Sequence, residues 1–277
     1  MKKLLIFTSI IGMFVLGFYF YFHNVGRIRP VVNEIFVVSA DVPTAFDGIR
    51  VVQISDLLVR SENCLILLES VVEEVNNVLN PEIIVFTGNL FLPEGLAFAE
   101  DVSNLLGMFD ASLSSLAVLG YHDIAHEELV RDVLEDAGFR VLNNEALQVF
   151  NQSPNGINVI GANPTNNHRT TKRLLQTQVD DASFNLLLAN SPLFTAVALE
   201  NYVDIQLSGL CLGTQDATNL MEPCFQFYDG IYQFADHLTL HVSSGLARFH
   251  TLSNFSQRPS IDSFLLVRDR NQTHLSE

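Results

Sequence analysis

The sequence predicts an α/β fold in which two β-sheets pack face to face and helices cover both outer faces. The first indication is a set of short apolar runs, each of the length of a buried strand and each ending at a polar or glycine-containing segment. These runs are Val51–Ile54, Ile83–Thr87, Leu116–Leu119, Phe184–Ala189 and Ile205–Ser208. The second indication is the helical spacing of apolar residues, with acids on the opposite face, over Leu65–Leu79 and Glu127–Ala137.

Three later apolar runs predict strands of the second sheet: Asn158–Gly161, Leu238–Val242 and Phe264–Arg268. We expect a hairpin turn at Gln152–Gly156 and a polar loop at Asn163–Lys172, because asparagine, proline and glycine favour turns. The alternative for the second segment is a loop that covers a functional site. The expected organisation is an anchor over residues 1–24, a lead-in segment over residues 25–47 and one domain over residues 48–277.

The N-terminus predicts a membrane anchor. After Lys2 and Lys3, Leu4–Phe22 is an uncharged run of 19 residues, which is long enough to cross a bilayer as a helix. A cleaved signal peptide is the alternative, but it predicts a shorter apolar region followed by a small-residue cleavage site. The basic residues on either side slightly favour a cytoplasmic N-terminus. We therefore expect a single-pass protein of the cell membrane whose domain lies outside the cytoplasm, with the bilayer as a partner through residues 4–22.

The composition excludes one class of partner. The chain has 31 acidic residues against 15 lysines and arginines, and its formal net charge is −16. Such a surface repels the phosphate backbone, so the sequence predicts no nucleic-acid partner. Hydrophobic residues make up 48% of the chain, which fits a globular domain joined to an apolar segment.

Five polar or glycine-containing segments follow predicted strands, where α/β folds place their ligands. In chain order they are Ile54-Ser55-Asp56-Leu57-Leu58, Thr87-Gly88-Asn89-Leu90-Phe91, Leu119-Gly120-Tyr121-His122-Asp123, Leu187-Leu188-Ala189-Asn190-Ser191-Pro192 and Ser208-Gly209-Leu210-Cys211-Leu212-Gly213-Thr214-Gln215. This order resembles that of the calcineurin-like metallophosphoesterases, whose pattern is D-x-H, G-D-x-x-D, G-N-H-[D/E], a lone His and G-H-x-H. The resemblance covers roughly residues 30 to 270 and is closest to the membrane-anchored bacterial branch, and it implies an αββα sandwich and two divalent metals.

The resemblance places other residues at most of the metal-ligand positions. Asp56 stands where the family has its first aspartate. The bridging aspartate is replaced by Asn89 and the lone histidine by Asn190, which would be weak substitutes. The remaining replaced positions are Leu58, Tyr121, Leu210 and Leu212. Six of the seven ligand positions are thus altered, while the resemblance leaves His122 to assist the phosphate or leaving group and Asp123 to orient it.

These replacements remove the donors that dinuclear phosphoester hydrolysis requires. Two cations held about 3.5–4 Å apart activate water and neutralise charge on the phosphate, and they need carboxylates and imidazoles as ligands. Leucine has no donor atom, and the amide of Asn89 carries no full charge. The sequence therefore predicts that the two metals implied by the family are not bound and that no cofactor is required.

Retained glycines contrast with the lost ligands. Each replacement is reachable by one nucleotide change, whereas the glycines at positions 88, 120, 209 and 213 remain. Glycine permits conformations and close contacts on which the fold itself depends. Both natural decay and deliberate ablation of an active site produce this pattern.

Side chains left at the site have simple structural interpretations. Asp56 is predicted to be a buried carboxylate that hydrogen-bonds to Asn89 and Asn190 or has a raised pKa. The leucines are expected to collapse together. Cys64, Cys211 and Cys224 are expected to be buried small hydrophobic residues; the alternatives are a Cys211–Cys224 disulfide and a single-metal site that joins Cys211 to Asp56 and His122. The other histidines show no ligand-like spacing.

The leading functional hypothesis is a membrane-anchored member of the family without phosphoesterase activity, which acts as a binding or regulatory module for an unidentified protein or a small phosphorylated ligand. The alternative is an active metal-dependent phosphodiesterase or phosphohydrolase that acts on a lipid- or envelope-linked phosphate. Metal content and metal-dependent turnover distinguish the two hypotheses.

Overall fold

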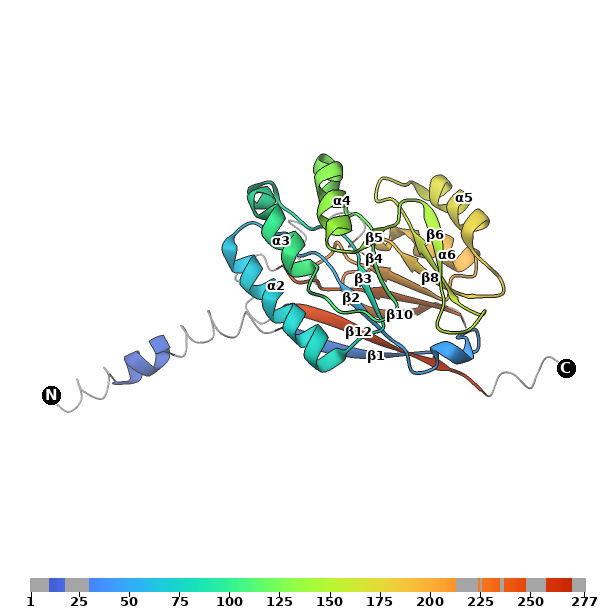
Figure 1. The fold of residues 1–277 in the computed structure, drawn as a ribbon, viewed down its shortest axis with the longest axis horizontal. Helices are drawn as coiled ribbons and strands as arrows, with labels where there is room; N and C mark the ends of the chain where they lie inside the picture. Colours follow the sequence, from blue (N-terminus) through green and yellow to red (C-terminus); the bar gives the residue numbers. More distant parts are fainter. Residues whose placement is uncertain are drawn as a thin grey trace.

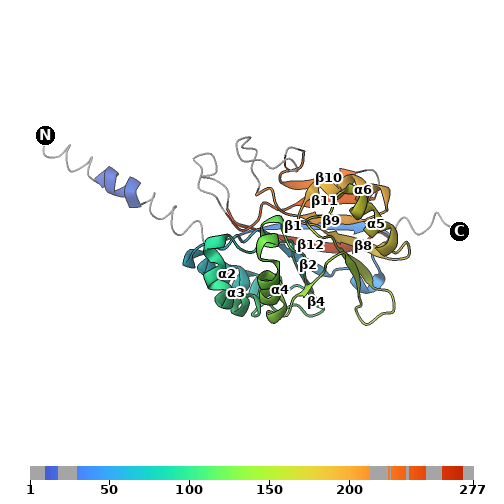
Figure 2. The ribbon, with the colours of Figure 1, turned by 90° about the horizontal axis from the view of Figure 1, so that it is seen from above.

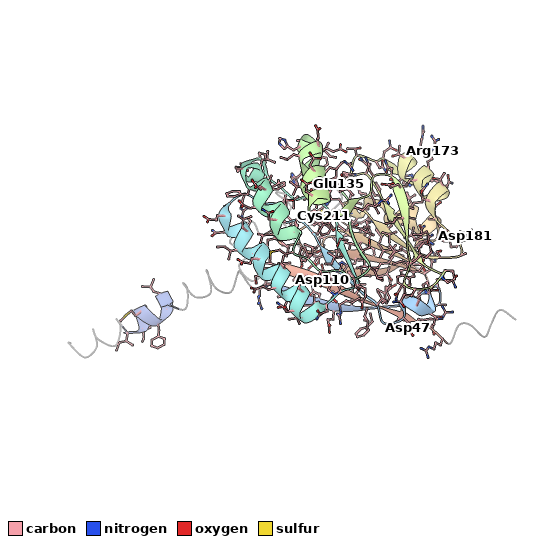
Figure 3. The ribbon with its side chains drawn as sticks, in the orientation of Figure 1. Asp47, Asp110, Glu135, Arg173, Asp181 and Cys211 are labelled. Carbon is pink, nitrogen blue, oxygen red and sulfur yellow. A yellow bond between two sulfur atoms is a disulfide. The ribbon has the colours of Figure 1, made fainter. Side chains whose placement is uncertain are left out.

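The computed structural model describes residues 10–17, 30–212, 224, 226–234, 237–247 and 258–270. These residues form two β-sheets stacked face to face between two layers of helices (Figures 1 and 2). The predicted α/β two-sheet fold is therefore confirmed. Figure 3 shows labelled charged side chains such as Glu135 and Arg173 at the outer surface of the helices, whereas Cys211 is buried.

The first sheet has six strands and is mostly parallel. In spatial order they are β1 (Val31–Ser39), β12 (Ser260–Arg268), β2 (Arg50–Ile54), β3 (Ile83–Phe86), β4 (Ser114–Ala117) and β5 (Arg140–Val141). Strands β2 to β5 run parallel, and β12 pairs antiparallel with β2. Because β2, β3 and β4 are parallel neighbours, their carboxyl ends lie together at one edge of the sheet.

The second sheet also has six strands. Their spatial order is β10 (Gly230–Phe234), β11 (Leu238–Val242), β9 (Ile205–Ser208), β8 (Phe184–Leu188), β7 (Ile157–Gly161) and β6 (Glu145–Val149). The central strands β7, β8, β9 and β11 are parallel, with antiparallel strands at both edges. The turn predicted at Gln152–Gly156 connects β6 to β7.

Helices cover the outer face of each sheet. The first sheet carries α2 (Glu62–Glu74), which continues into η2 (Val75–Leu79), together with α3 (Ala99–Leu106) and α4 (Glu127–Asp136). The second sheet carries α5 (His168–Gln178) and α6 (Thr195–Glu200). Short turns η1 (Thr44–Phe46), η3 (Pro93–Phe98), η4 (Tyr121–His126) and η5 (Pro192–Phe194) complete the connections.

Three apolar layers hold the sandwich together. On β2, Val51 faces the core between the sheets, whereas Val52 and Ile54 face the helices. On β8 the same division places Leu186 between the sheets and Leu187 under α5 and α6. Strands buried on both faces explain why these runs are continuously apolar rather than alternating.

Two predictions are wrong in detail. Phe264–Arg268, expected in the second sheet, belongs to β12 in the first sheet, where Phe264 pairs with Val51 of β2 and packs between the sheets. Asn163–Lys172 is not a loop throughout, because α5 begins at His168. The Asn167 side chain caps that helix by accepting a hydrogen bond from the Thr170 N–H at 3.0 Å.

The N-terminal predictions are covered only in part. Residues 31–39, expected in the lead-in segment, form β1 and pair with β12, so the first sheet begins before residue 48. Within the predicted anchor, residues 10–17 are helical, and the rest of the anchor lies outside the described residues. Over the described part of the chain, no helix has both the length and the apolar character needed to cross a membrane.

Candidate functional site

The five segments singled out in the sequence meet at the carboxyl ends of β2, β3, β4, β8 and β9. Asp56 follows β2 and receives a hydrogen bond from Asn89, which follows β3. Asn190, which follows β8, accepts one from the backbone N–H of Tyr121, which follows β4. Leu210, which follows β9, donates its backbone N–H to Asp56. The parallel strands of both sheets therefore deliver these segments to one place, as the strand pattern predicts.

Asp56 is fully buried, and three protein donors satisfy it. Oδ1 accepts the Asn89 amide at 2.6 Å, while Oδ2 accepts the Ser55 hydroxyl at 2.6 Å and the Leu210 N–H at 2.9 Å. Burial raises the pKa of Asp56 to about 6, although these hydrogen bonds oppose the shift. The expectation of a buried carboxylate that bonds to Asn89 is confirmed, whereas Asn190 is not among these three donors.

Asn89 lies at the centre of the site and bonds in two directions. Its Nδ2 donates to Asp56, and its Oδ1 accepts the backbone N–H of His122 at 2.9 Å. The side chain is 1% exposed. A Cβ on Gly120 would lie 2.2 Å from the Asn89 Oδ1, so glycine is required where the two turns approach each other.

Asn190 has a different role from the one predicted. Its Oδ1 accepts the Tyr121 N–H at 3.1 Å, and its Nδ2 donates to the Thr87 carbonyl at 2.8 Å. Only Asn89, of the two asparagines expected to bind Asp56, does so. Asn190 instead ties the second sheet to the loops that follow β3 and β4.

Asp123 is held by the backbone. Its carboxylate accepts the N–H groups of Asn89 at 2.7 Å, Leu90 at 2.8 Å and Gly120 at 2.7 Å. Burial raises the pKa of Asp123, and these backbone donors oppose the shift. The contacts make Asp123 the group that fixes the turn after β3 against the turn after β4.

His122 lies at the surface of the site. Its ring is exposed and packs edge-on against the exposed Tyr121 ring, with 6.1 Å between centroids. Partial burial lowers the pKa of His122, which favours the neutral imidazole at neutral pH. A neutral imidazole can accept a proton.

Leucines stand at three of the remaining positions that the resemblance assigns to ligands, and they have an unusual backbone. Leu58 and Leu210 are 1% and 8% exposed, and Leu212 is half-buried. Their φ angles are 44°, 75° and 52°, a left-handed conformation that costs an L-residue about 1–2 kcal/mol. Of the nine non-glycine residues with positive φ in the described part of the chain, five occupy ligand positions: Asp56, Leu58, Asn89, Leu210 and Leu212. Positive φ angles are thus concentrated at the positions that the family resemblance assigns to metal ligands.

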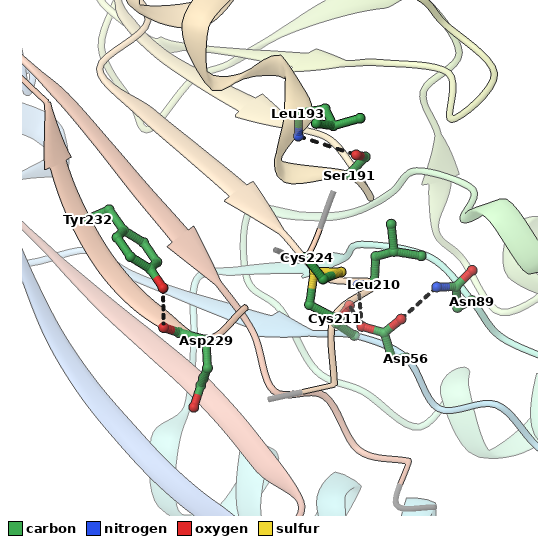
Figure 4. The surroundings of a disulfide bond; sticks show 10 residues. Asp56, Asn89, Ser191, Leu193, Leu210, Cys211, Cys224, Asp229 and Tyr232 are labelled. Carbon is green, nitrogen blue, oxygen red and sulfur yellow. Dashed lines mark hydrogen bonds between the residues drawn. A yellow bond between two sulfur atoms is a disulfide. The ribbon is translucent and has the colours of Figure 1, made fainter. Parts of the chain in front are cut away.

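The cysteines correct one sequence expectation. Cys211 and Cys224 are buried, as expected, but they form a disulfide with 5.4 Å between their Cα atoms (Figure 4). The disulfide removes the thiolate that the single-metal alternative requires. Cys64 is a free, half-buried residue.

Donors for metal ions are sparse around Asp56. The described residues contain no group of three or more His, Cys, Asp and Glu side chains that could hold a metal ion. Gly213 and residues 214 and 215 of the last segment lie outside the described part of the chain. The side chains present do not fit a pair of divalent cations, because one enclosed carboxylate and two amides replace a set of charged and imidazole ligands.

A second buried polar cluster was missed in the sequence. His241 of β11, expected at the surface or as a packing residue, is 3% exposed; its Nδ1 lies 3.0 Å from Gln53 Oε1 and its Nε2 lies 3.7 Å from Asp262 Oδ1. Burial lowers the pKa of His241. Gln53 also donates to the Ser208 carbonyl at 2.9 Å, directly below the loop that carries Leu210. The sequence contained a signal for this cluster, because Gln53 and His241 are polar residues inside otherwise apolar strands.

Comparisons with known proteins agree with this fold. No family model matches the chain. The chain is 24% identical over 243 residues to the uncharacterized metallophosphoesterase YkuE of Bacillus subtilis (strain 168), and the match covers 84% of each protein. Membership of the metallophosphoesterase family is supported by this relative.

Two solved structures are similar to the chain at low sequence identity. NAD nucleotidase (NadN) of Haemophilus influenzae has a TM-score of 0.50 and 12% identity, and the alignment covers 72% of this chain and 45% of NadN. The 5'-nucleotidase precursor of Thermus thermophilus has a TM-score of 0.45 and 12% identity, over 79% of this chain and 54% of that one. The chain spans about half the length of these two proteins, and the NadN match supports the two-sheet fold alone.

Proposed function

We propose that this chain is a metallophosphoesterase-family protein that has lost dinuclear-metal hydrolysis and acts at a membrane as a binding or regulatory module. The observation that carries the proposal is the coordination of Asp56. Its oxygens accept hydrogen bonds from Ser55, Asn89 and the Leu210 N–H. The one carboxylate left from the ligand set is therefore occupied by the protein.

The chemistry of the neighbouring side chains supports the same conclusion. Leu58 and Leu210 place buried hydrocarbon where imidazoles would be needed, and Asn89 gives Asp56 a donor where a second carboxylate would share a metal. Changes outside the immediate ligands already weaken metal binding by about 10–100-fold. The combined loss of six ligands accounts for an inactive centre.

The membrane location is also part of the proposal. The run Leu4–Phe22 has the length and apolar character of an anchor. The helical residues 10–17 within it expose Met13, Phe14 and Leu16 by 70%, 77% and 68%, and such side chains are stable in lipid rather than in water. We propose a single-pass arrangement with the domain on the extracytoplasmic side.

The side chains at the surface of the site indicate where a ligand would bind. Tyr121 and Leu193 are 57% and 52% exposed, and His122 lies beside Tyr121. Tyr121 and His122 follow β4, and Leu193 follows β8. An aromatic ring, a neutral imidazole and an apolar side chain suit a protein partner or a small phosphorylated ligand.

The test measures metal content and metal-dependent hydrolysis on the same full-length preparation in detergent, purified without chelator. We expect substoichiometric metal and no hydrolysis of bis-(p-nitrophenyl) phosphate above background with Mn²⁺. His122→Ala and the exposed control His126→Ala should both behave as the wild type. Stoichiometric metal with turnover that only His122→Ala abolishes would overturn the proposal.

That opposite result would favour the second candidate, an active phosphodiesterase or phosphohydrolase that acts on a lipid- or envelope-linked phosphate. The observation in its favour is the presence of His122, exposed and with a lowered pKa, at the position where the family assists the phosphate or leaving group.

A further inference from the structure

The segment that follows β9 is attached to the rest of the fold by a covalent bond. Cys211, just beyond the carboxyl end of β9, forms a disulfide with Cys224, which precedes β10. Both cysteines are almost fully buried, at 2% and 3% exposure, and they pack against Leu240 and Val242 of β11. The bond therefore joins the segment to the apolar layer over β11.

The residue next to the disulfide closes the site around Asp56. Leu210 donates its N–H to Asp56 Oδ2 at 2.9 Å, and its side chain belongs to the same apolar cluster as the two cysteines. Figure 4 shows Leu210 between the disulfide and the Asp56–Asn89 pair. Whatever holds Cys211 in place also holds Leu210 over Asp56.

The local backbone does not favour this position by itself. Leu210 and Leu212 have φ angles of 75° and 52°, a conformation that L-residues other than asparagine and aspartate seldom adopt. One hydrogen bond from Leu210 and the packing of its side chain oppose this strain. A cross-link supplies the missing restraint, because it reduces the number of conformations open to the segment.

We propose that the Cys211–Cys224 disulfide is a strap that holds Leu210 in place over Asp56. A dithiol reductant would open it: two electrons and two protons pass to the disulfide, the S–S bond breaks to give two thiols, and the dithiol becomes a cyclic disulfide. Release of Cys211 then frees Leu210 from Asp56. The inference does not depend on whether the protein is catalytic.

Amide hydrogen exchange on the full-length protein in detergent tests the strap. The probes are the Leu210 N–H, which bonds to Asp56, and the N–H of Val85 in the central strand β3. The paired change Cys211→Ser with Cys224→Ser is compared with Cys64→Ser, which removes the free cysteine. Wild-type protein incubated with dithiothreitol provides the same comparison without a substitution.

We expect the Leu210 amide to exchange at least about tenfold faster in the double variant and after reduction, the factor that accompanies loss of a hydrogen bond to a charged group. The Val85 amide should change little, and Cys64→Ser should match the wild type. Unchanged exchange at Leu210 would overturn the proposal. Equal acceleration at Leu210 and Val85 would also overturn it, because the disulfide would then stabilise the whole domain.

Failure of this inference can be distinguished from failure of the proposed function, because different measurements test the two. Metal content and hydrolysis are measured on oxidised protein, whereas the strap is measured by exchange at one amide. A hydrolytically active protein in which Leu210 opens on reduction would refute the proposed function and leave the strap intact. An inactive protein in which exchange at the Leu210 amide does not change on reduction would refute the strap and leave the proposed function intact.

Discussion

The substitution Asn89→Asp, which introduces the aspartate that the family resemblance implies at this position, should destabilise this protein. In the wild type, Asn89 Nδ2 donates to Asp56 Oδ1 at 2.6 Å, and both side chains are at most 1% exposed. The substitution replaces this donor by a second carboxylate. Two buried carboxyl groups at this separation cannot both ionise without a cation, so the folded pair must retain a proton.

The cost can be worked from the contacts. Loss of a hydrogen bond to a charged group costs about 1.5–3 kcal/mol. The pKa of Asp56 is already raised to about 6, and a second carboxylate raises the pKa of the pair further. Holding one proton at pH 8 then costs at least about 3 kcal/mol, at 1.36 kcal/mol for each pH unit above that pKa. The two costs together predict a destabilisation of at least about 4.5 kcal/mol at pH 8.

The pH dependence has a definite sign. The folded pair has a raised pKa, so the folded state binds more protons than the unfolded state above about pH 4, and stability falls as pH rises through that window. Relative to the wild type, Asn89→Asp should be about 3 kcal/mol more destabilising at pH 8 than at pH 5. The assay is unfolding followed by far-ultraviolet circular dichroism across this pH range, because the chain contains no tryptophan.

A swapped pair provides the control. Asp56→Asn combined with Asn89→Asp again places one amide beside one carboxylate. This double variant should recover most of the stability that the single change loses, and its pH profile should return toward the wild type. The reasoning fails if Asn89→Asp has the same pH profile as the wild type, or if the swapped pair is as unstable as the single variant.

Three further changes test the loops and the buried acids. Asp123→Ala leaves three backbone N–H groups without their acceptor and should lower the unfolding free energy by about 3–5 kcal/mol. A loss below about 1 kcal/mol would contradict this expectation and would mean that water replaces the carboxylate. Gly209→Ala would place a Cβ 2.0 Å from the Ser55 Oγ and should lower the unfolding free energy by at least about 2 kcal/mol. This loss should exceed that of the control Gly48→Ala, where φ is positive and the space is open. Equal losses of the two variants in thermal unfolding would contradict the steric argument. Burial raises the pKa of Asp204 to about 7, so the folded state binds the extra proton and stability should fall by up to about 4 kcal/mol as pH rises from about 4 to 7. Asp204→Asn should remove that part of the measured slope, and an unchanged slope would show that other groups cause it.

Much of the fold follows from local pattern. The five apolar runs that precede the site were predicted as strands, and each one contains or overlaps an observed strand, because a strand buried on both faces has a continuously apolar sequence. Helix α4 was predicted from its amphipathic spacing. Helices α3, α5 and α6 were missed, since few residues carry the periodic signal there.

The positions that differ from the family pattern were also visible in the sequence. Leu58, Asn89 and Leu210 can be identified at these positions without coordinates, and burial of Asp56 could be expected from its apolar neighbours. Properties that depend on residue type alone can therefore be predicted from the sequence. The hydrogen-bond partners of each residue cannot be predicted in this way.

Tertiary structure alone decided how the emptied site is held. It assigned Asn89 to Asp56 and Asn190 to the Tyr121 backbone, placed β12 in the first sheet, and joined Cys211 to Cys224. These contacts link residues far apart in the chain, and local periodicity carries no information about which distant segments meet. The sequence by itself determined which residue types stand at the five segments, whereas the packing of two sheets decided that Ser55, Asn89 and Leu210 donate to Asp56 and that a disulfide lies next to Leu210 in the chain.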